Sequence, residues 1–173
     1  MPFPRSFVFA ISALSLCAQT APSPLPASDL KDPDGQKVAF RFKTLPNSVQ
    51  IYTCRQVNQA YSWTGPDPDA VMISTDKKLT VHHYKGPTWE ATDGSIVRSE
   101  GPLAKHFLAP DKSAVHWLEL PAKSPEGQFA KVTFIHRIET SGGVAPEKAC
   151  DGQHAGDQER VNYSATYVFY VPK

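Results

Sequence analysis

The sequence has almost no net charge. Its 173 residues include 18 Lys and Arg against 17 Asp and Glu, which gives a formal charge of +1. A domain that binds nucleic acid normally carries a clear basic excess, with which it neutralises phosphates. This chain lacks that excess, so we exclude nucleic acid as a partner.

Long hydrophobic runs are also missing. The longest, residues 7–18, is about twelve residues, whereas a membrane-spanning helix needs about 20, so no transmembrane segment is predicted. Arg5 precedes this run, and small residues and prolines follow it. That order is typical of a secretory signal peptide, here residues 1–18, with cleavage after Ala18 or Ala21. We therefore expect a secreted or periplasmic protein.

Cysteine is scarce, with only Cys17, Cys54 and Cys150. A lipid anchor on Cys17 is the alternative to simple cleavage, but Leu16 stands where a lipid-attachment site has a small residue. Removal of the signal peptide leaves Cys54 and Cys150 in an oxidising compartment, which predicts a disulfide between them. The alternative is two buried free thiols.

Several enzyme motifs are absent. The sequence has no G-x-G-x-x-G after a strand, which argues against a dinucleotide cofactor, and no G-x-S-x-G nucleophile elbow. Oxidised cysteines are unavailable as nucleophiles. We predict no cofactor, and no motif defines a reaction.

What the chain does contain is typical of one globular domain, since 40% of its residues are hydrophobic and 20% charged. Residues 19–35 are rich in Pro and poor in large apolar residues, which predicts a flexible or extended leader. Residues 36–173 then form a single β domain, a length sufficient for one core.

Apolar residues of this domain alternate with polar ones, which is the pattern of half-buried β-strands. Asp-Gly, Gly-Pro and Gly-Gly pairs separate the alternating segments and mark turns. We expect an all-β fold, a β-sandwich or partly closed barrel of about eight to ten mostly antiparallel strands. Alternation is clearest in residues 38–42, 49–54, 79–84, 132–138 and 163–171.

One hairpin can be assigned a register. Asp93-Gly94 suits a two-residue type I′ turn, which pairs Ala91 with Ile96 and Trp89 with Arg98. These four residues would then share the packed face, with Arg98 over the Trp89 ring, and Glu90 would be exposed on the other.

Four sequence blocks carry a resemblance to a known family. They run from Val49 to Cys54 (VQIYTC), from His83 to Ser95 (HYKGPTWEATDGS), over residues 140–146 (TSGGVAP) and over residues 163–170 (YSATYVFY). Together they resemble the secreted bacterial and fungal family catalogued as domain of unknown function 3455, over nearly all of the folded body.

The resemblance implies that Cys54 and Cys150 are the usual pair and that Gly-Pro-Thr-Trp-Glu is the signature. It also implies a glutamine where this chain has His136. Some fungal relatives are described as malate dehydrogenases. We reject that activity for this chain because it lacks both the dinucleotide motif and an alternation of strands with helices.

Candidate functional groups cluster in the signature block. His82, His83, Glu90 and Asp93 lie within twelve residues, and imidazole with carboxylate can bind a divalent ion or exchange protons. Neighbouring residues on a strand face opposite sides, so only one histidine can join Glu90. We predict no metal site, with His83 and Glu90 as the weak alternative, and interpret Asp93 as a turn residue.

Aromatic residues offer a second kind of site. Tyr61, Trp63 and Trp89 could form a stacking surface for a flat ligand, and packing in the core is the alternative for each.

Our main hypothesis is therefore an exported, non-enzymatic β protein that binds a small molecule, a glycan or a cell-envelope component. Its ligand-binding candidates are His83, Glu90, Trp63, Tyr61 and Trp89. The alternatives are an enzyme that acts on saccharides or small acids, with Glu90 as general acid or base, and a purely structural envelope protein. The oligomeric state and the catalytic residues, if any, are left open.

Overall fold

A computed structural model describes residues 23–100 and 105–173 of the chain. The expected signal peptide, with Cys17, lies outside these residues. The all-β prediction is confirmed, since the described residues form ten strands and two short 3-10 helices. The strands are β1 (Gln36–Thr44), β2 (Val49–Val57), β3 (Ala60–Ser74), β4 (Thr80–Tyr84), β5 (Thr88–Ala91), β6 (Ile96–Ser99), β7 (Lys105–Phe107), β8 (Trp117–Lys123), β9 (Phe134–Gly142) and β10 (Gln158–Pro172); the helices are η1 (Ala27–Asp29) and η2 (Gly127–Phe129).

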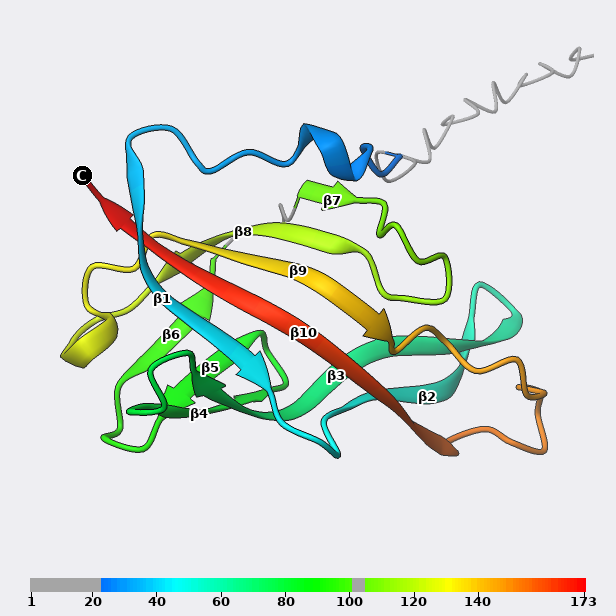
Figure 1. Ribbon diagram of the computed structural model, residues 1–173. Coiled ribbons are helices and arrows are strands. Elements are labelled where there is room, and N and C mark those ends of the chain that lie inside the picture. The colour runs from blue at the N-terminus through cyan, green and yellow to red at the C-terminus, as the bar shows by residue number, and fades with distance from the viewer. Residues whose placement is uncertain (1–22, 101–104) are drawn as a thin grey trace, which may run out of the picture.

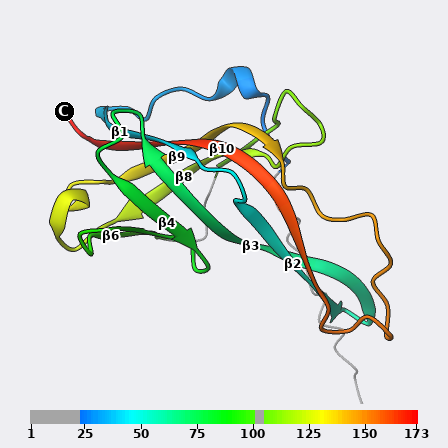
Figure 2. The ribbon, with the colours of Figure 1, turned by 60° about the horizontal axis from the view of Figure 1, so that its bottom comes forward.

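The strands form one antiparallel sheet whose pairings return to their starting point. β2 pairs with β3, and the order continues through β4, β5, β6, β8 and β9 to β10, which pairs with β2 again. β1 also pairs with β10, next to the stretch of β10 that pairs with β2, and β7 flanks β8. Figures 1 and 2 show the long β10 crossing the molecule between β1 and β9.

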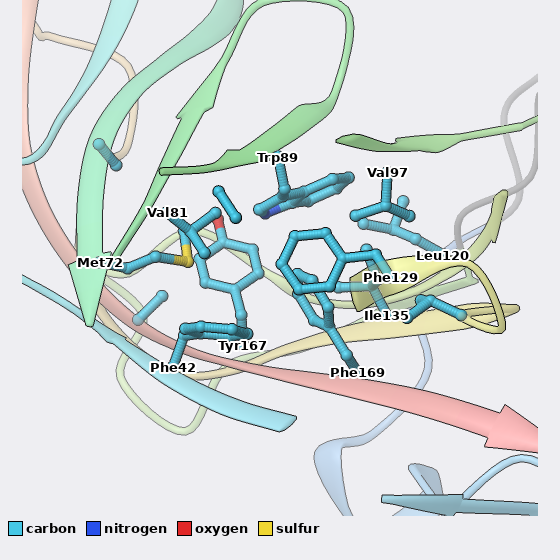
Figure 3. Close-up of a cluster of buried hydrophobic side chains, with 14 of the residues drawn as sticks. Phe42, Met72, Val81, Trp89, Val97, Leu120, Phe129, Ile135, Tyr167 and Phe169 are labelled. Atoms are coloured by element: carbon cyan, nitrogen blue, oxygen red, sulfur yellow. The ribbon is translucent and has the colours of Figure 1, made fainter. Parts of the chain in front are cut away.

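The core fills the inside of this ring. Large side chains from opposite sides of it meet there, and Phe129 of η2 closes one part of the cluster (Figure 3). The Phe42 and Phe169 rings are 5.0 Å apart, and Phe129 lies edge-on to Phe169 at 5.3 Å. Aromatic pairs at such separations add to the stability gained from apolar burial.

The hairpin register predicted for residues 88–98 is wrong by one position. Trp89 pairs with Val97, not with Arg98, and Glu90 pairs with Ile96. The loop contains Thr92 as well as Asp93 and Gly94, because the Ala91 amide bonds to the Ser95 carbonyl and Gly94 has φ +84°. A three-residue loop with a left-handed glycine is the next most common hairpin geometry after the two-residue turn.

The corrected register changes which side chains are buried. Trp89, Ala91 and Val97 face the core, whereas Arg98 is exposed and does not lie over the Trp89 ring.

Where the structure describes it, the Pro-rich leader contains the short helix η1. None of residues 23–35 is buried. Two contacts nevertheless hold it in place: Leu25 forms a parallel bridge with Phe107 of β7, and Asp32 accepts a hydrogen bond of 2.6 Å from the Tyr170 hydroxyl. Across the two described ranges, no helix is long and apolar enough to cross a membrane.

Candidate functional site

A half-open cavity of about 180 Å³ is lined by residues from the ring of strands, from its loops and from β7; its lining includes the exposed Pro87 and His106. Its wall combines apolar side chains such as Leu118 and Leu120 with a few polar or amphipathic ones, and the latter come from six different strands. Small-molecule sites usually have this composition, mostly apolar with a small number of placed polar groups. We call this cavity the interior pocket; its polar or amphipathic wall residues used below are Gln50, His83, Trp89, Arg137 and Tyr167.

His83 points into the interior pocket from β4. Its ring stacks on Trp89 with the two centroids 4.3 Å apart and the planes nearly parallel. Its Nδ1 lies 2.9 Å from the Thr88 carbonyl oxygen, which can only accept, so Nδ1 carries the ring proton. Burial lowers the pKa of His83 from 6.5 to about 3. The ring is therefore neutral at pH 7 and keeps a lone pair on Nε2.

Gln50 and Trp89 leave hydrogen-bonding capacity unused at the pocket wall. Both side chains are at most 1% exposed. Gln50 Oε1, Gln50 Nε2 and Trp89 Nε1 have no hydrogen-bond partner among the residues that the structure describes. Buried polar atoms without partners cost free energy and are rare in native proteins, so each calls for an explanation.

The Gly-Gly pair of residues 142 and 143 supports the wall. Both have positive φ, as glycines readily do. A Cβ atom on Gly143 would lie 2.7 Å from Cβ of Tyr163 and 3.2 Å from Cγ of Gln50, so only glycine allows this backbone to pass. The Gly143 carbonyl in turn accepts a hydrogen bond of 2.7 Å from Tyr52. The block of residues 140–146, one of the four blocks that carry the family resemblance, therefore places the backbone of Gly143 against Gln50.

Arg137 and Tyr167 complete the polar part of the pocket. Arg137 donates from Nε and Nη2 to the His116 carbonyl, at 3.2 and 2.9 Å, which fixes its guanidinium. The Tyr167 hydroxyl lies 3.3 Å from that of Tyr163. Burial raises the pKa of Tyr167, and the nearby Arg137 charge opposes this shift only in part. Tyr167 is therefore a neutral hydrogen-bonding group.

The buried His83 should make stability depend on pH. Between pH 6.5 and about 3 the unfolded chain binds a proton at His83 that the folded chain does not, so stability is retained above pH 6.5 and falls on acidification. The expected slope from this group is about 1.4 kcal/mol per pH unit. Urea unfolding at pH 7, 6 and 5 should show a shallower slope for His83→Gln than for the wild type.

The matched control for this measurement is His82→Gln, on the exposed face of the same strand. It should keep the wild-type slope. Equal slopes for the wild type and His83→Gln would contradict the assignment of His83 as a buried neutral ring.

Glu90 lies on the other face of the sheet from His83. It is the cross-strand partner of His82, while His83 pairs with Trp89, so the structure does not bring His83 and Glu90 together. Glu90 accepts a hydrogen bond of 2.9 Å from Tyr84. No group of three or more potential metal ligands occurs in the described part of the chain.

His82 belongs to an ion-pair chain on that outer face. Its Nε2 is 3.0 Å from Asp69, which also receives Arg160 Nη2 at 2.6 Å. The hydrogen bonds from Arg160 and His82 lower the pKa of Asp69, so this carboxylate stays ionised.

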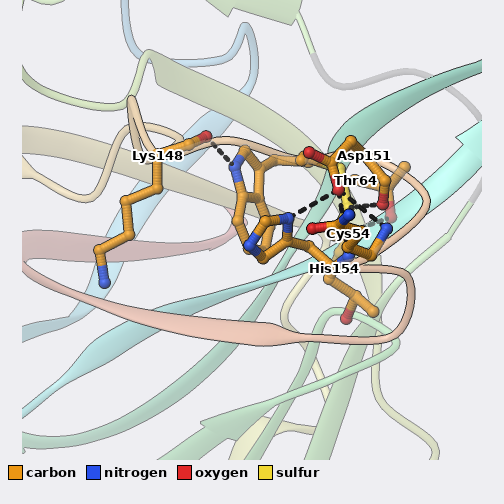
Figure 4. The surroundings of a disulfide bond; sticks show 9 residues. Cys54, Thr64, Lys148, Asp151 and His154 are labelled. Carbon is orange, nitrogen blue, oxygen red and sulfur yellow. Dashed lines mark hydrogen bonds and ion pairs between the residues drawn. A yellow bond between two sulfur atoms is a disulfide. The ribbon is translucent and has the colours of Figure 1, made fainter.

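Trp63 and Tyr61 lie at the disulfide, away from the interior pocket wall. The predicted Cys54–Cys150 bond is present, and Trp63 is the cross-strand partner of Cys54. Trp63 Nε1 donates to the Lys148 carbonyl at 2.9 Å, and Asp151 and His154 contact each other in the same loop (Figure 4). The Tyr61 ring packs beside Gly152. Both aromatic residues therefore hold the Cys150 loop, and neither lines the interior pocket.

A second, larger cavity of about 870 Å³ lies between the leader and strands β7 to β9. A chain of polar contacts borders it: Lys105 and His136 both contact Glu119, at 2.6 and 3.3 Å, and His136 contacts Tyr170, which donates to Asp32 of the leader. Burial lowers the pKa of His136 more than Glu119 raises it. Since these groups already bond to one another, this network anchors the leader.

Sequence reasoning named His83 and Trp89 of the interior pocket and missed Gln50, Arg137 and Tyr167. A signal for Gln50 was present in the alternation of residues 49–54, where it shares a face with Tyr52 and Cys54. Both of those residues are buried. A polar residue in register with buried ones is a candidate for a polar group inside the fold. Tyr167 carried the same signal, because it alternates in step with Tyr163, Ala165 and Phe169, which are buried. For Arg137 the local sequence held no such signal.

The fold and the cavity together define an all-β protein in which a closed ring of antiparallel strands holds a small, mostly apolar pocket with a few polar groups. Residues 72–171, well over half of the chain, match the model of the family described as protein of unknown function (DUF3455), so the chain belongs to this family. The matched range includes His83 and Trp89 but begins after the strand with Gln50 and Cys54. Comparison with curated proteins and with solved structures gives no match.

Proposed function

We propose that this protein is exported to the extracellular space or periplasm and binds a small molecule in the interior pocket without transforming it. The apolar run at residues 7–18 supports export, and the Cys54–Cys150 bond is compatible with an oxidising compartment. The binding part of the proposal depends on one observation: a cavity of about 180 Å³ whose wall is mostly apolar and carries a few polar side chains.

The size of the interior pocket favours a small molecule over a glycan chain or a larger envelope component. An apolar cavity of about 150 Å³ can hold benzene. At about 180 Å³, the interior pocket has room for one ring with a substituent, and an oligosaccharide would not fit.

Binding without catalysis follows from the pocket's chemistry. No carboxylate is among the described residues that line it, so His83 has no carboxylate partner there with which to exchange a proton. Glu90, the candidate acid or base of the enzyme alternative, borders neither of the two cavities.

Toluene and phenol are suitable first probes, because both match the pocket in size. Titration of the isolated protein should shift the indole N–H resonance of Trp89, which Trp89→Phe identifies. Leu118→Phe, which places extra bulk at the pocket wall, should weaken binding by at least about tenfold.

Val71→Phe is the matched control, because Val71 is 42% exposed on β3 and lies outside the pocket. It should bind like the wild type. If neither probe shifts the Trp89 resonance, or if Leu118→Phe and Val71→Phe bind equally, the interior pocket is not the binding site.

A further inference from the structure

We infer that the interior pocket binds small organic monocarboxylates, with a compact apolar body of about one ring, in preference to neutral molecules of the same shape. This inference rests on the proposed function and specifies the ligand class for the same site. Its basis is Arg137 of β9, which is the one permanent cation among the described residues of the pocket lining.

Arg137 is a partly buried cation without a counter-ion in the described chain. None of the ion pairs between the described residues includes it. Its side chain keeps part of its surface exposed, and none of its nitrogens is among the sealed, unpaired atoms that Gln50 and Trp89 contribute. A ligand in the half-open pocket can therefore reach the guanidinium. Since a partly buried charge is costly when it is unpaired, an anion is favoured there.

The strand register places Arg137 in one row with Leu118 and His106. Leu118 of β8 is the cross-strand partner of Arg137 on β9 and of His106 on β7. Cross-strand partners share a face, and all three residues line the pocket. Neighbouring strands are about 4.8 Å apart, so about 10 Å separates the backbones of Arg137 and His106. A carboxylate above the apolar Leu118 lies between these two nitrogen-bearing side chains.

The adjacent row of the same three strands already contains such a carboxylate. It consists of Lys105, Glu119 and His136, and Glu119 in the middle contacts nitrogens of both neighbours, at 2.6 and 3.3 Å. Glu119 therefore balances the Lys105 charge. The row of the interior pocket has Leu118 at the same central position, so the chain supplies no balancing charge for Arg137. A ligand carboxylate would take the role in this row that Glu119 has in the other.

The charges that act on the pocket histidines are positive. Burial, then His116 and Arg137, lower the pKa of His106. Burial is the main cause that lowers the pKa of His83, and the Arg137 charge adds to it. No acidic side chain of the described chain opposes these shifts at either ring. The potential inside the pocket therefore attracts an anion.

The geometry of Arg137 favours a monocarboxylate over a phosphate. One permanent positive charge neutralises a monoanion, whereas a dianion would stay charged in a mostly apolar pocket. The planar guanidinium can also donate to both oxygens of a carboxylate. Its Nε and Nη2 hold it against the His116 carbonyl, so little ordering is needed when a ligand binds. Pro66, Leu118 and Leu120 supply apolar surface for the rest of the ligand.

Benzoate, benzamide and toluene test the inference, because benzoate and benzamide have nearly the same shape and differ in charge. At pH 7 the isolated protein should bind benzoate at least about tenfold more tightly than benzamide or toluene, measured by calorimetry. Benzoate should also displace toluene, followed at the Trp89 indole resonance, because both occupy the same pocket.

Two substitutions of Arg137 separate its charge from its packing. Arg137→Gln should weaken benzoate binding by at least about tenfold and leave toluene binding within about twofold. Arg137→Lys keeps a cation, so it should still bind benzoate more tightly than benzamide. Arg55→Gln is the matched control, because it removes an exposed arginine of β2 that lies outside the pocket, and it should behave as wild type.

The outcomes separate this inference from the proposed function. Equal binding of the three compounds, or tighter binding of benzamide, would overturn the carboxylate preference while the pocket remained a binding site. A preference for benzoate that Arg137→Gln leaves unchanged, or benzoate that does not displace toluene, would also overturn it. Binding of none of the three would overturn both. The comparison and the displacement use the wild-type protein, so they remain decisive even if Arg137→Gln does not fold.

Discussion

Removal of the disulfide, by Cys54→Ala together with Cys150→Ala, should lower the free energy of unfolding by about 4 to 5 kcal/mol. The two cysteines are 96 residues apart in sequence, so the bond greatly restricts the unfolded chain, and loop entropy gives a loss of this size. Urea unfolding of the oxidised wild type and the double variant measures the difference. A typical domain has a total stability of about 5 to 15 kcal/mol, so the variant would be close to unfolding.

The contacts around the disulfide make the test specific. The Cys54 amide donates to the Asp157 carbonyl, and the Gly156 amide donates to the Cys54 carbonyl, both at 2.9 Å. These bonds can persist in the variant, so its native state should keep the wild-type circular dichroism. Reduced wild type is the matched control and should lose the same stability. A difference below about 1 kcal/mol, or two reactive thiols in the denatured unreduced protein, would contradict the prediction.

Gly143→Ala should destabilise the protein by about 3 kcal/mol and weaken ligand binding. Two costs combine at this position. A non-glycine residue at φ +80° costs about 1 to 2 kcal/mol, and the new Cβ would lie 2.7 Å from Tyr163 Cβ, an overpacking that costs about 1 to 3 kcal/mol. Chemical unfolding gives the loss of stability, and titration with toluene, followed at the Trp89 resonance, measures the loss of binding.

Gly35→Ala separates the two costs. Gly35 also has positive φ, +71°, but a Cβ there would meet nothing within 4 Å. Its expected loss is therefore about 1 to 2 kcal/mol, with unchanged binding. If both variants lose the same stability, the close approach at Gly143 does not contribute.

The sequence predicted the fold class because the relevant information is local. Alternation of apolar and polar residues in segments such as Val49 to Cys54 reflects the two faces of a strand, and the structure has strands at each clearly alternating segment. The disulfide was predicted in the same way, since two cysteines left in an oxidising compartment allow only one pairing within the chain.

The hairpin at Asp93-Gly94 shows where local reasoning failed. This dipeptide fits both a two-residue and a three-residue loop. Contacts with η2 are consistent with the longer loop: Ser95 Oγ accepts from the Gln128 amide at 2.8 Å, and Asp93 accepts from the Gln128 side chain at 2.6 Å. Gln128 is more than 30 residues away, so no turn rule includes it.

By itself, the sequence determined an all-β chain with a single disulfide and a set of inward-facing residues on each strand. Only the tertiary structure decided which of these residues meet. It paired Glu90 with His82 and not with His83, left Tyr61 and Trp63 at the disulfide, and joined His83 and Trp89 to Gln50, Arg137 and Tyr167 around one pocket. The physical reason is that strand periodicity assigns each side chain to a face, whereas closure of the ring, which brings distant strands together, depends on long-range pairing and core packing.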